Sequence, residues 1–158
     1  MNALEKIKYH LREAERIGEE ELGANNIFYN EGFIEAFMAD NLNHVWNTDT
    51  QGGDAFEDDG TPTEYKAINT RSKSKGSFQF HWLSDNKMEK LHRTNNMYFA
   101  RRAGVMVDEI YKVGTPRLID KISEKATKSK STNGHVGFSF KQILNLDPTQ
   151  VYASNHSA

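Results

Sequence analysis

The stretch GGDAFEDDGTPTEYKAINT constrains the fold more than any other part of the chain, because it is typical of two strands joined by a turn. Its DGTP segment combines glycine and proline, which favour turns. Alternate residues of a strand point to the same side, so Glu64 and Lys66 share one face while Tyr65 points to the other, into the core. A hairpin of this length brings Asp54 alongside Glu64. The sequence therefore predicts that two carboxylates and one ammonium group converge on a small volume.

Asp54, Glu64 and Lys66 together have the chemistry of a site that hydrolyses phosphodiesters. Adjacent carboxylates repel each other, and a hard cation such as Mg²⁺ relieves that repulsion by taking oxygen ligands. The cation polarises a phosphoryl oxygen and lowers the pKa of a bound water, while Lys66 orients that water or stabilises developing negative charge. A structural ion pair between Glu64 and Lys66 on an exposed strand face gives the same short pattern, and the pattern alone favours this simpler interpretation.

The other segments predict helices around a mostly antiparallel sheet, in a single domain of residues 1–158. Helical spacing of apolar residues indicates helices at 3–22 and 27–42. The second helix is expected to turn five apolar residues inward, namely Phe33, Ile34, Phe37, Met38 and Leu42. Further expected elements are a strand in 77–83, a helix at 84–94, a hairpin at 97–113, a helix at 117–126, a flexible basic loop at 125–137, and a strand or short helix in 138–148. The predicted fold class is α+β or mixed α/β, with a central mixed sheet flanked by helices.

Composition narrows the possible classes of protein. The 158 residues include no cysteine, which excludes disulfides, thiolate nucleophiles and cysteine-based zinc sites and fits a cytoplasmic location. No apolar run is long enough to span a bilayer, and the first residues lack the apolar core of a secretory signal, so no membrane partner is expected. The net charge of −2 means that any affinity for DNA must come from unevenly placed charge.

Charge is unevenly placed along the chain. Acidic residues concentrate at 13–21 and 49–59, whereas basic residues gather in short segments further on. A phosphate backbone would favour basic patches around an acidic pocket, although each cluster taken alone is more simply a solvated face or loop. The basic residues are Arg71, Lys73, Lys75, Arg101, Arg102, Lys121, Lys125, Lys128 and Lys130.

Five segments resemble, in order along the chain, those of a known class of nuclease. GGDAFEDDGTPTEYK resembles the active-site strands of the PD-(D/E)xK nucleases, in which a central sheet carries the aspartate and the Glu-x-Lys; Gly53 stands where that superfamily has a proline. NNIFYNEG, KGSFQFHWL, MYFARRAGVMVDEIYKV and NGHVG resemble further segments of the PvuII-type restriction endonucleases. The resemblance covers most of the chain and favours a nuclease over a structural ion pair.

The resemblance implies a homodimer that grips palindromic double-stranded DNA, with one metal site per subunit cutting one strand. It implies that Asp54 and Glu64 bind Mg²⁺, or Mn²⁺ in its place, and that the carbonyl of Tyr65 is a further ligand. Lys66 would then be the catalytic lysine. No small organic cofactor is implied.

The resemblance also divides the single domain by role. The helices of residues 3–42 are expected to dimerise, residues 44–113 to form the catalytic sheet, and residues 114–158 to recognise DNA and close the core. Dimerisation would give a partner to a narrow apolar stripe on the first helix, which comprises Leu4, Ile7, Leu11 and Ile17.

DNA contacts are implied at positions where the chain often departs from the family. Asn30 replaces an aspartate, and of a histidine cluster only His81 keeps its type, followed here by Trp82 and Leu83. Tryptophan and leucine lack the donors and acceptors of major-groove readout, so the recognised bases are expected to differ. His92 would bind a water near the metal, or lie on a helix surface. The candidates for DNA contact, with solvated loops as the alternative for several, are Asn30, Arg71, Lys73, Lys75, His81, Trp82, Asn133 and His135.

These features predict a sequence-specific, Mg²⁺-dependent type II restriction endonuclease. A phage or repair endonuclease or nickase on the same fold, or a small subunit of a heterodimeric enzyme, would use the same residues without reading a palindrome. A DNA-binding module with a purely structural acidic cluster is the alternative outside enzymes.

Overall fold

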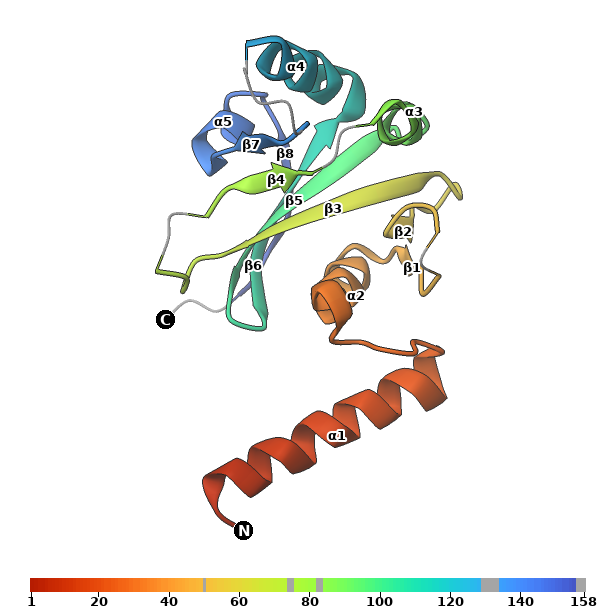
Figure 1. The fold of residues 1–158 in the computed structure, drawn as a ribbon, viewed down its shortest axis with the longest axis vertical. Helices are drawn as coiled ribbons and strands as arrows, with labels where there is room; N and C mark the ends of the chain where they lie inside the picture. The colour runs from red at the N-terminus through yellow and green to blue at the C-terminus, as the bar shows by residue number, and fades with distance from the viewer. Residues whose placement is uncertain (50, 74–75, 82–83, 129–133, 156–158) are drawn as a thin grey trace.

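The computed structural model describes residues 1–49, 51–73, 76–81, 84–128 and 134–155. Three candidates for DNA contact, Lys75, Trp82 and Asn133, lie outside these ranges. The helices are α1 (Ala3–Leu22), α2 (Gly32–Leu42), α3 (Asp85–His92), α4 (Thr115–Lys128) and α5 (Phe140–Leu144), with a 3-10 turn, η1, at Tyr29–Glu31 (Figure 1). The strands are β1 (Val45–Trp46), β2 (Ala55–Phe56), β3 (Pro62–Asn69), β4 (Phe78–Phe80), β5 (Asn96–Ala103), β6 (Met106–Gly114), β7 (Val136–Phe138) and β8 (Thr149–Ala153).

Six of these strands form a central sheet in the order β1-β2-β3-β5-β6-β8 (Figure 1). Strands β3 and β5 pair in parallel, whereas the other neighbours in the sheet are antiparallel. A parallel pair needs a long connection, and β4 and α3 lie within the one between β3 and β5. Strands β4 and β7 form a separate two-stranded antiparallel sheet. The mixed sheet flanked by helices confirms the predicted fold class.

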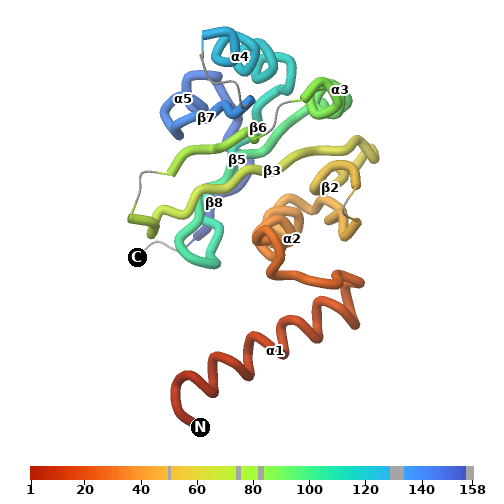
Figure 2. The backbone as a smooth tube through the Cα atoms, in the orientation of Figure 1, coloured from red at the N-terminus to blue at the C-terminus, as the bar shows by residue number. Residues whose placement is uncertain are grey.

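Strand β5 is central and its side chains alternate between two apolar clusters on the two faces of the sheet. Met97 and Phe99 belong to a cluster that includes residues of α3, α4, α5 and the small sheet. Tyr98 and Ala100 belong to a cluster that includes residues of α2. Figure 2 shows α2 on the opposite side of the sheet from α3 and α4. The sheet that contains β3 and β5 therefore has one face covered by α2 and the other covered by α3, α4, α5 and the small sheet.

Helix α1 lies apart from the sheet (Figure 1). It begins with a capping box at Asn2 and ends at Gly23, whose φ of 68° favours glycine. Leu4, Ile7 and Leu11 follow one another along one face and are 60%, 55% and 47% exposed, so they have no cover within the described part of the chain. Ile17, predicted to belong to the same apolar stripe, is also exposed but falls on another face of a helix with 3.6 residues per turn. Neither α1 nor any other described helix is both long and apolar enough to cross a membrane.

The predicted helix at 27–42 is wrong at its start. Helix α2 begins only at Gly32, because Asn30 and Glu31 adopt positive φ values of 49° and 58° that a helix cannot contain. Phe37, predicted to face inward, is 42% exposed. Its ring packs edge-on against Phe33 instead of entering the core below α2.

The C-terminal third is more regular than predicted. The expected loop at 125–137 begins with the last turn of α4 and ends in β7, which pairs with β4. Strand β8, which pairs with β6 at the edge of the sheet, was not predicted. Both strands are short, and their partners are far away in the sequence, so local periodicity could not reveal them.

Candidate active site

A hairpin formed by β2 and β3 brings Asp54 opposite Glu64. Ala55 pairs with Thr63 in the antiparallel register, which makes Asp54 and Glu64 the next facing pair. The Asp54 carboxylate accepts a hydrogen bond of 2.7 Å from the backbone N–H of Tyr65, and its own backbone N–H donates to the Thr63 carbonyl at 2.9 Å. The aspartate is therefore fixed to the neighbouring strand by its main chain and its side chain.

Glycine at position 53 has a steric cause. A Cβ atom there would lie 2.6 Å from the carbonyl oxygen of Thr63, closer than any ordinary contact. A backbone that approaches this closely requires glycine. Gly53 replaces the proline of the related nucleases at a point where the segment before Asp54 approaches β3 too closely for a side chain.

The Asp54 and Glu64 side chains lie within hydrogen-bonding reach of each other and are partly buried. Burial, reinforced by the charge of Asp54, raises the pKa of Glu64 to about 8, and the nearby Lys66 ammonium opposes this rise. Burial also raises the pKa of Asp54, against the lowering effects of the Tyr65 N–H and Lys66. One ammonium group is therefore insufficient to compensate the carboxylates, and the cluster favours an additional cation.

Sequence reasoning missed a third carboxylate, that of Glu35 on α2. Burial and the charge of Asp54 raise the pKa of Glu35 to about 8, while Lys66 and Trp46 lower it. The buried indole N–H of Trp46 reaches no acceptor at ordinary hydrogen-bond distance in the described residues. Glu35 is the only charged residue between 32 and 39, and a lone acid in an apolar helix was the available signal.

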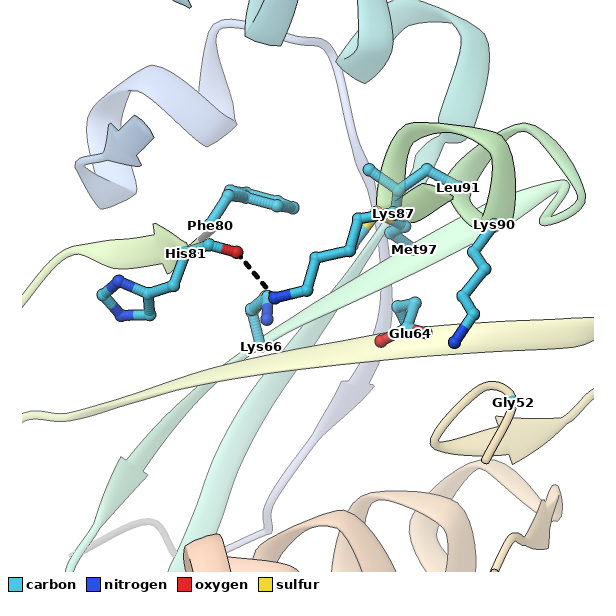
Figure 3. A pocket seen from close by; sticks show the side chains of 9 residues that line it. All are labelled: Gly52, Glu64, Lys66, Phe80, His81, Lys87, Lys90, Leu91 and Met97. Atoms are coloured by element: carbon cyan, nitrogen blue, oxygen red, sulfur yellow. Dashed lines mark hydrogen bonds between the residues drawn. The ribbon is translucent and has the colours of Figure 1, made fainter. Parts of the chain in front are cut away.

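Lys66 and Glu64 line an open cavity of about 310 Å³ on the face of β3 opposite Tyr65. The ammonium group of Lys66 lies 5.3 Å from the ring centroid of Phe80. Figure 3 shows Lys66 and Glu64 beneath α3, which contributes side chains to the opposite wall. The cavity gives a substrate access to Glu64 and to Lys66 at the same time.

Partly buried polar contacts lie on the other face of the same strand. Tyr65 is 4% exposed, as predicted for a core position, and its hydroxyl lies 2.8 Å from Nδ1 of His44. Tyr98 donates a hydrogen bond of 2.5 Å to Glu57, which also accepts from the side chain of Asn96 at 3.0 Å. The first bond ties β3 to the segment before β1, and the other two tie β5 to the β2–β3 turn, so together they rigidify the hairpin that carries Asp54 and Glu64.

The described candidates for DNA contact fall into separate groups. His81 and His135, which are 54 residues apart, meet at the end of the β4–β7 sheet with their Nδ1 atoms 2.7 Å apart. Arg71 and Lys73 follow β3 and are exposed, and Lys73 lines a second cavity. Asn30 is exposed on η1.

His92 lines neither the Glu64 cavity nor the one beside Lys73. It is exposed at the end of α3 and lines another cavity with Thr94 and Asp120. The structure therefore does not bring His92 to the carboxylate pair, and its position agrees with the alternative of a histidine on a helix surface.

The donor set fits a hard divalent cation. In the described ranges, no group of three or more histidine and acidic side chains is arranged to hold a metal ion. Mg²⁺, however, commonly binds through one or two carboxylates and keeps several waters. Asp54 and Glu64 supply such a pair, and a cation between them would offset both the burial of Glu64 and the charge of Asp54, which together raise the pKa of Glu64.

An aspartate beside one strand of a mixed sheet and a Glu-x-Lys on the next are typical of the PD-(D/E)xK nucleases. Among these, the family model Restriction endonuclease PvuII matches residues 1–140, and the chain belongs to this family. Its class is therefore that of a nuclease acting on DNA. No curated protein sequence matches the chain significantly.

Proposed function

We propose that this chain is a sequence-specific type II restriction endonuclease that hydrolyses phosphodiester bonds of double-stranded DNA with Mg²⁺. The observation that carries the proposal is the pairing of Asp54 with Glu64, which lines an open cavity together with Lys66. Binding alone would leave this arrangement unexplained, since burying two repelling carboxylates is costly and serves no DNA contact. Catalysis uses each of the three groups.

Each residue of the site has its own proposed role in catalysis. Asp54, Glu64 and the carbonyl of Tyr65 would hold Mg²⁺, or Mn²⁺ in its place, with Glu35 as a further carboxylate nearby. The bound cation would polarise a phosphoryl oxygen and lower the pKa of a water. Lys66 orients the attacking water or stabilises the negative charge that develops on the phosphate. The Tyr65 N–H keeps the Asp54 carboxylate in position throughout.

Sequence recognition is assigned to groups outside the carboxylate pair. The His81–His135 pair at the end of the β4–β7 sheet offers ring nitrogens that can donate to or accept from base edges. Arg71 and Lys73, which are exposed beyond the end of β3, are proposed to contact phosphates, and Asn30 offers an exposed amide. Trp82, Lys75 and Asn133 remain candidates from the sequence alone.

The chain is proposed to act as a homodimer through residues 3–42, because a palindrome is cut on both strands by two identical sites. The apolar stripe of Leu4, Ile7 and Leu11 is the support for this assignment. We expect the double variant Leu4→Asp/Leu11→Asp to shift the chain from twice 18.0 kDa to 18.0 kDa in light scattering, because charge at an apolar contact is unfavourable. Lys6→Asp, which adds the same side chain outside the stripe, should stay dimeric; a monomeric wild type would contradict the assignment.

A supercoiled plasmid incubated with the protein and Mg²⁺ tests the proposed function. Cutting into discrete bands is expected, and sequencing of the fragment ends would give the recognised bases. Nicking, or degradation without bands, would point to the phage or repair type of nuclease. A plasmid left intact but bound would favour a DNA-binding module and contradict the proposal.

A further inference from the structure

Helix α3 places two lysines over the cavity that contains Glu64. Ser84 caps the start of the helix, where its hydroxyl accepts from the Lys87 backbone N–H, and Leu91, which is 7% exposed, anchors the helix. Residues three apart on a helix share a face, so Lys87 and Lys90 point the same way, toward β3 (Figure 3). Lys90 also lines a neighbouring cavity that again includes Glu64.

The charges at this cavity are unbalanced. Lys66, Lys87 and Lys90 contribute three ammonium groups to its wall, whereas Glu64 contributes one carboxylate. Within the described ranges, neither Lys87 nor Lys90 forms a salt bridge, and the only side-chain hydrogen bond of the two is from Lys87 to the His81 carbonyl at 2.8 Å. If Glu64 binds a cation, its charge is shared with that ion, and the cavity becomes more positive.

We propose that Lys87 and Lys90 bind a backbone phosphate of the DNA next to the one that is cleaved. This inference rests on the proposed function, since it takes the Asp54–Glu64 pair as the point of cleavage. One of the three N–H groups of Lys87 donates to the His81 carbonyl, which leaves two that can donate to an anion. The same lysine thereby ties the segment that leads to the His81–His135 pair to the cleavage site. Phe80, Leu91 and Met97 form the apolar wall behind the ammonium groups.

The salt dependence of DNA binding tests this assignment. The probe is a fluorescently labelled duplex of mixed sequence, titrated in EDTA over a range of NaCl concentrations, so that no cleavage is needed. Each phosphate contact contributes about 0.9 to the slope of log K against log salt. For the double variant Lys87→Ala/Lys90→Ala, the magnitude of this slope is expected to be smaller by about 1 to 2. Its affinity for the duplex near 0.1 M salt should be at least about eightfold lower than that of the wild type.

Two sets of variants separate a phosphate contact from a structural effect. Lys87→Arg/Lys90→Arg keeps both charges and should restore the slope. Lys121→Ala, on α4 outside the cavity and paired with Glu124, should leave the slope unchanged. An unchanged slope and affinity in the alanine double variant, with a melting temperature like that of the wild type, would overturn the proposal.

The two proposals fail separately. If the wild type cuts plasmid with Mg²⁺ but the double variant keeps the full salt slope, the lysine assignment falls and the proposed function stands. If the variants show the predicted slope changes in EDTA but the wild type never cuts, the proposed function falls and the lysines remain a DNA-phosphate site.

Discussion

Replacing Lys66 by alanine is expected to lower the rate of DNA cleavage at least about 100- to 1,000-fold, because one preorganised charge at the reacting group typically contributes that much. Lys66 lies on the same strand and face as Glu64 and lines the same cavity. The measurement is a single-turnover plasmid digest with saturating protein and Mg²⁺. The affinity of this variant for a DNA duplex in EDTA should fall by no more than about tenfold, which is the contribution of one charge that contacts a phosphate.

A second substitution separates charge from packing at this position. The Lys66 ammonium group lies over the ring of Phe80, so alanine removes a packing stem as well as a charge. Lys66→Met keeps most of the stem and should be as inactive as Lys66→Ala. Lys112→Ala, on β6 and outside the cavity, should cut like the wild type. Cutting retained in both Lys66 variants would remove the assigned role.

The metal-free protein is expected to lose stability as the pH rises from about 4.5 to about 8. Glu35 and Glu64 have pKa values raised from 4.5 to about 8 in the folded protein, chiefly by burial. The folded chain therefore holds protons that the unfolded chain has released within this window, and the stability that these protons provide is lost as they dissociate. Melting temperatures in EDTA across the window measure the effect.

Two comparisons isolate the carboxylates from other titrating groups. Burial lowers the pKa of His44, which acts in the opposite direction because stability is lost as the pH falls through its range. Glu35→Gln should melt at least about 3 °C above the wild type at pH 8 in EDTA, and close to it at pH 5. Mg²⁺ should raise the melting temperature of the wild type more at pH 8 than at pH 5. A melting temperature that stays flat in EDTA through the window, with no gain for Glu35→Gln, would refute this account.

The pairing of Asp54, Glu64 and Lys66 could be predicted because it depends on local rules. A glycine and a proline mark the turn, and the period of a strand puts Glu64 and Lys66 on one side and Tyr65 on the other. The hairpin at 97–113 was predictable for the same reason, and β5 and β6 confirm it.

The remaining features depend on contacts between distant segments. Glu35 joins the site only because α2 packs against the face of the sheet opposite α3 and α4, which no local pattern specifies. His81 and His135 meet because β4 pairs with β7, and three-residue strands carry too little periodicity to predict that pairing. The positive φ values at Asn30 and Glu31 are likewise set by their surroundings, where Glu31 forms an ion pair of 2.6 Å with the buried Arg102.

The most direct test of the account is anomalous diffraction from crystals of the wild-type protein grown with Mn²⁺ and duplex DNA. The account predicts a manganese peak bound by carboxylate oxygens of Asp54 and Glu64, with the Lys66 ammonium group facing the phosphate on the other side. Manganese bound elsewhere, with the Asp54–Glu64 pair free of metal while the same crystals contain cut DNA, would contradict it.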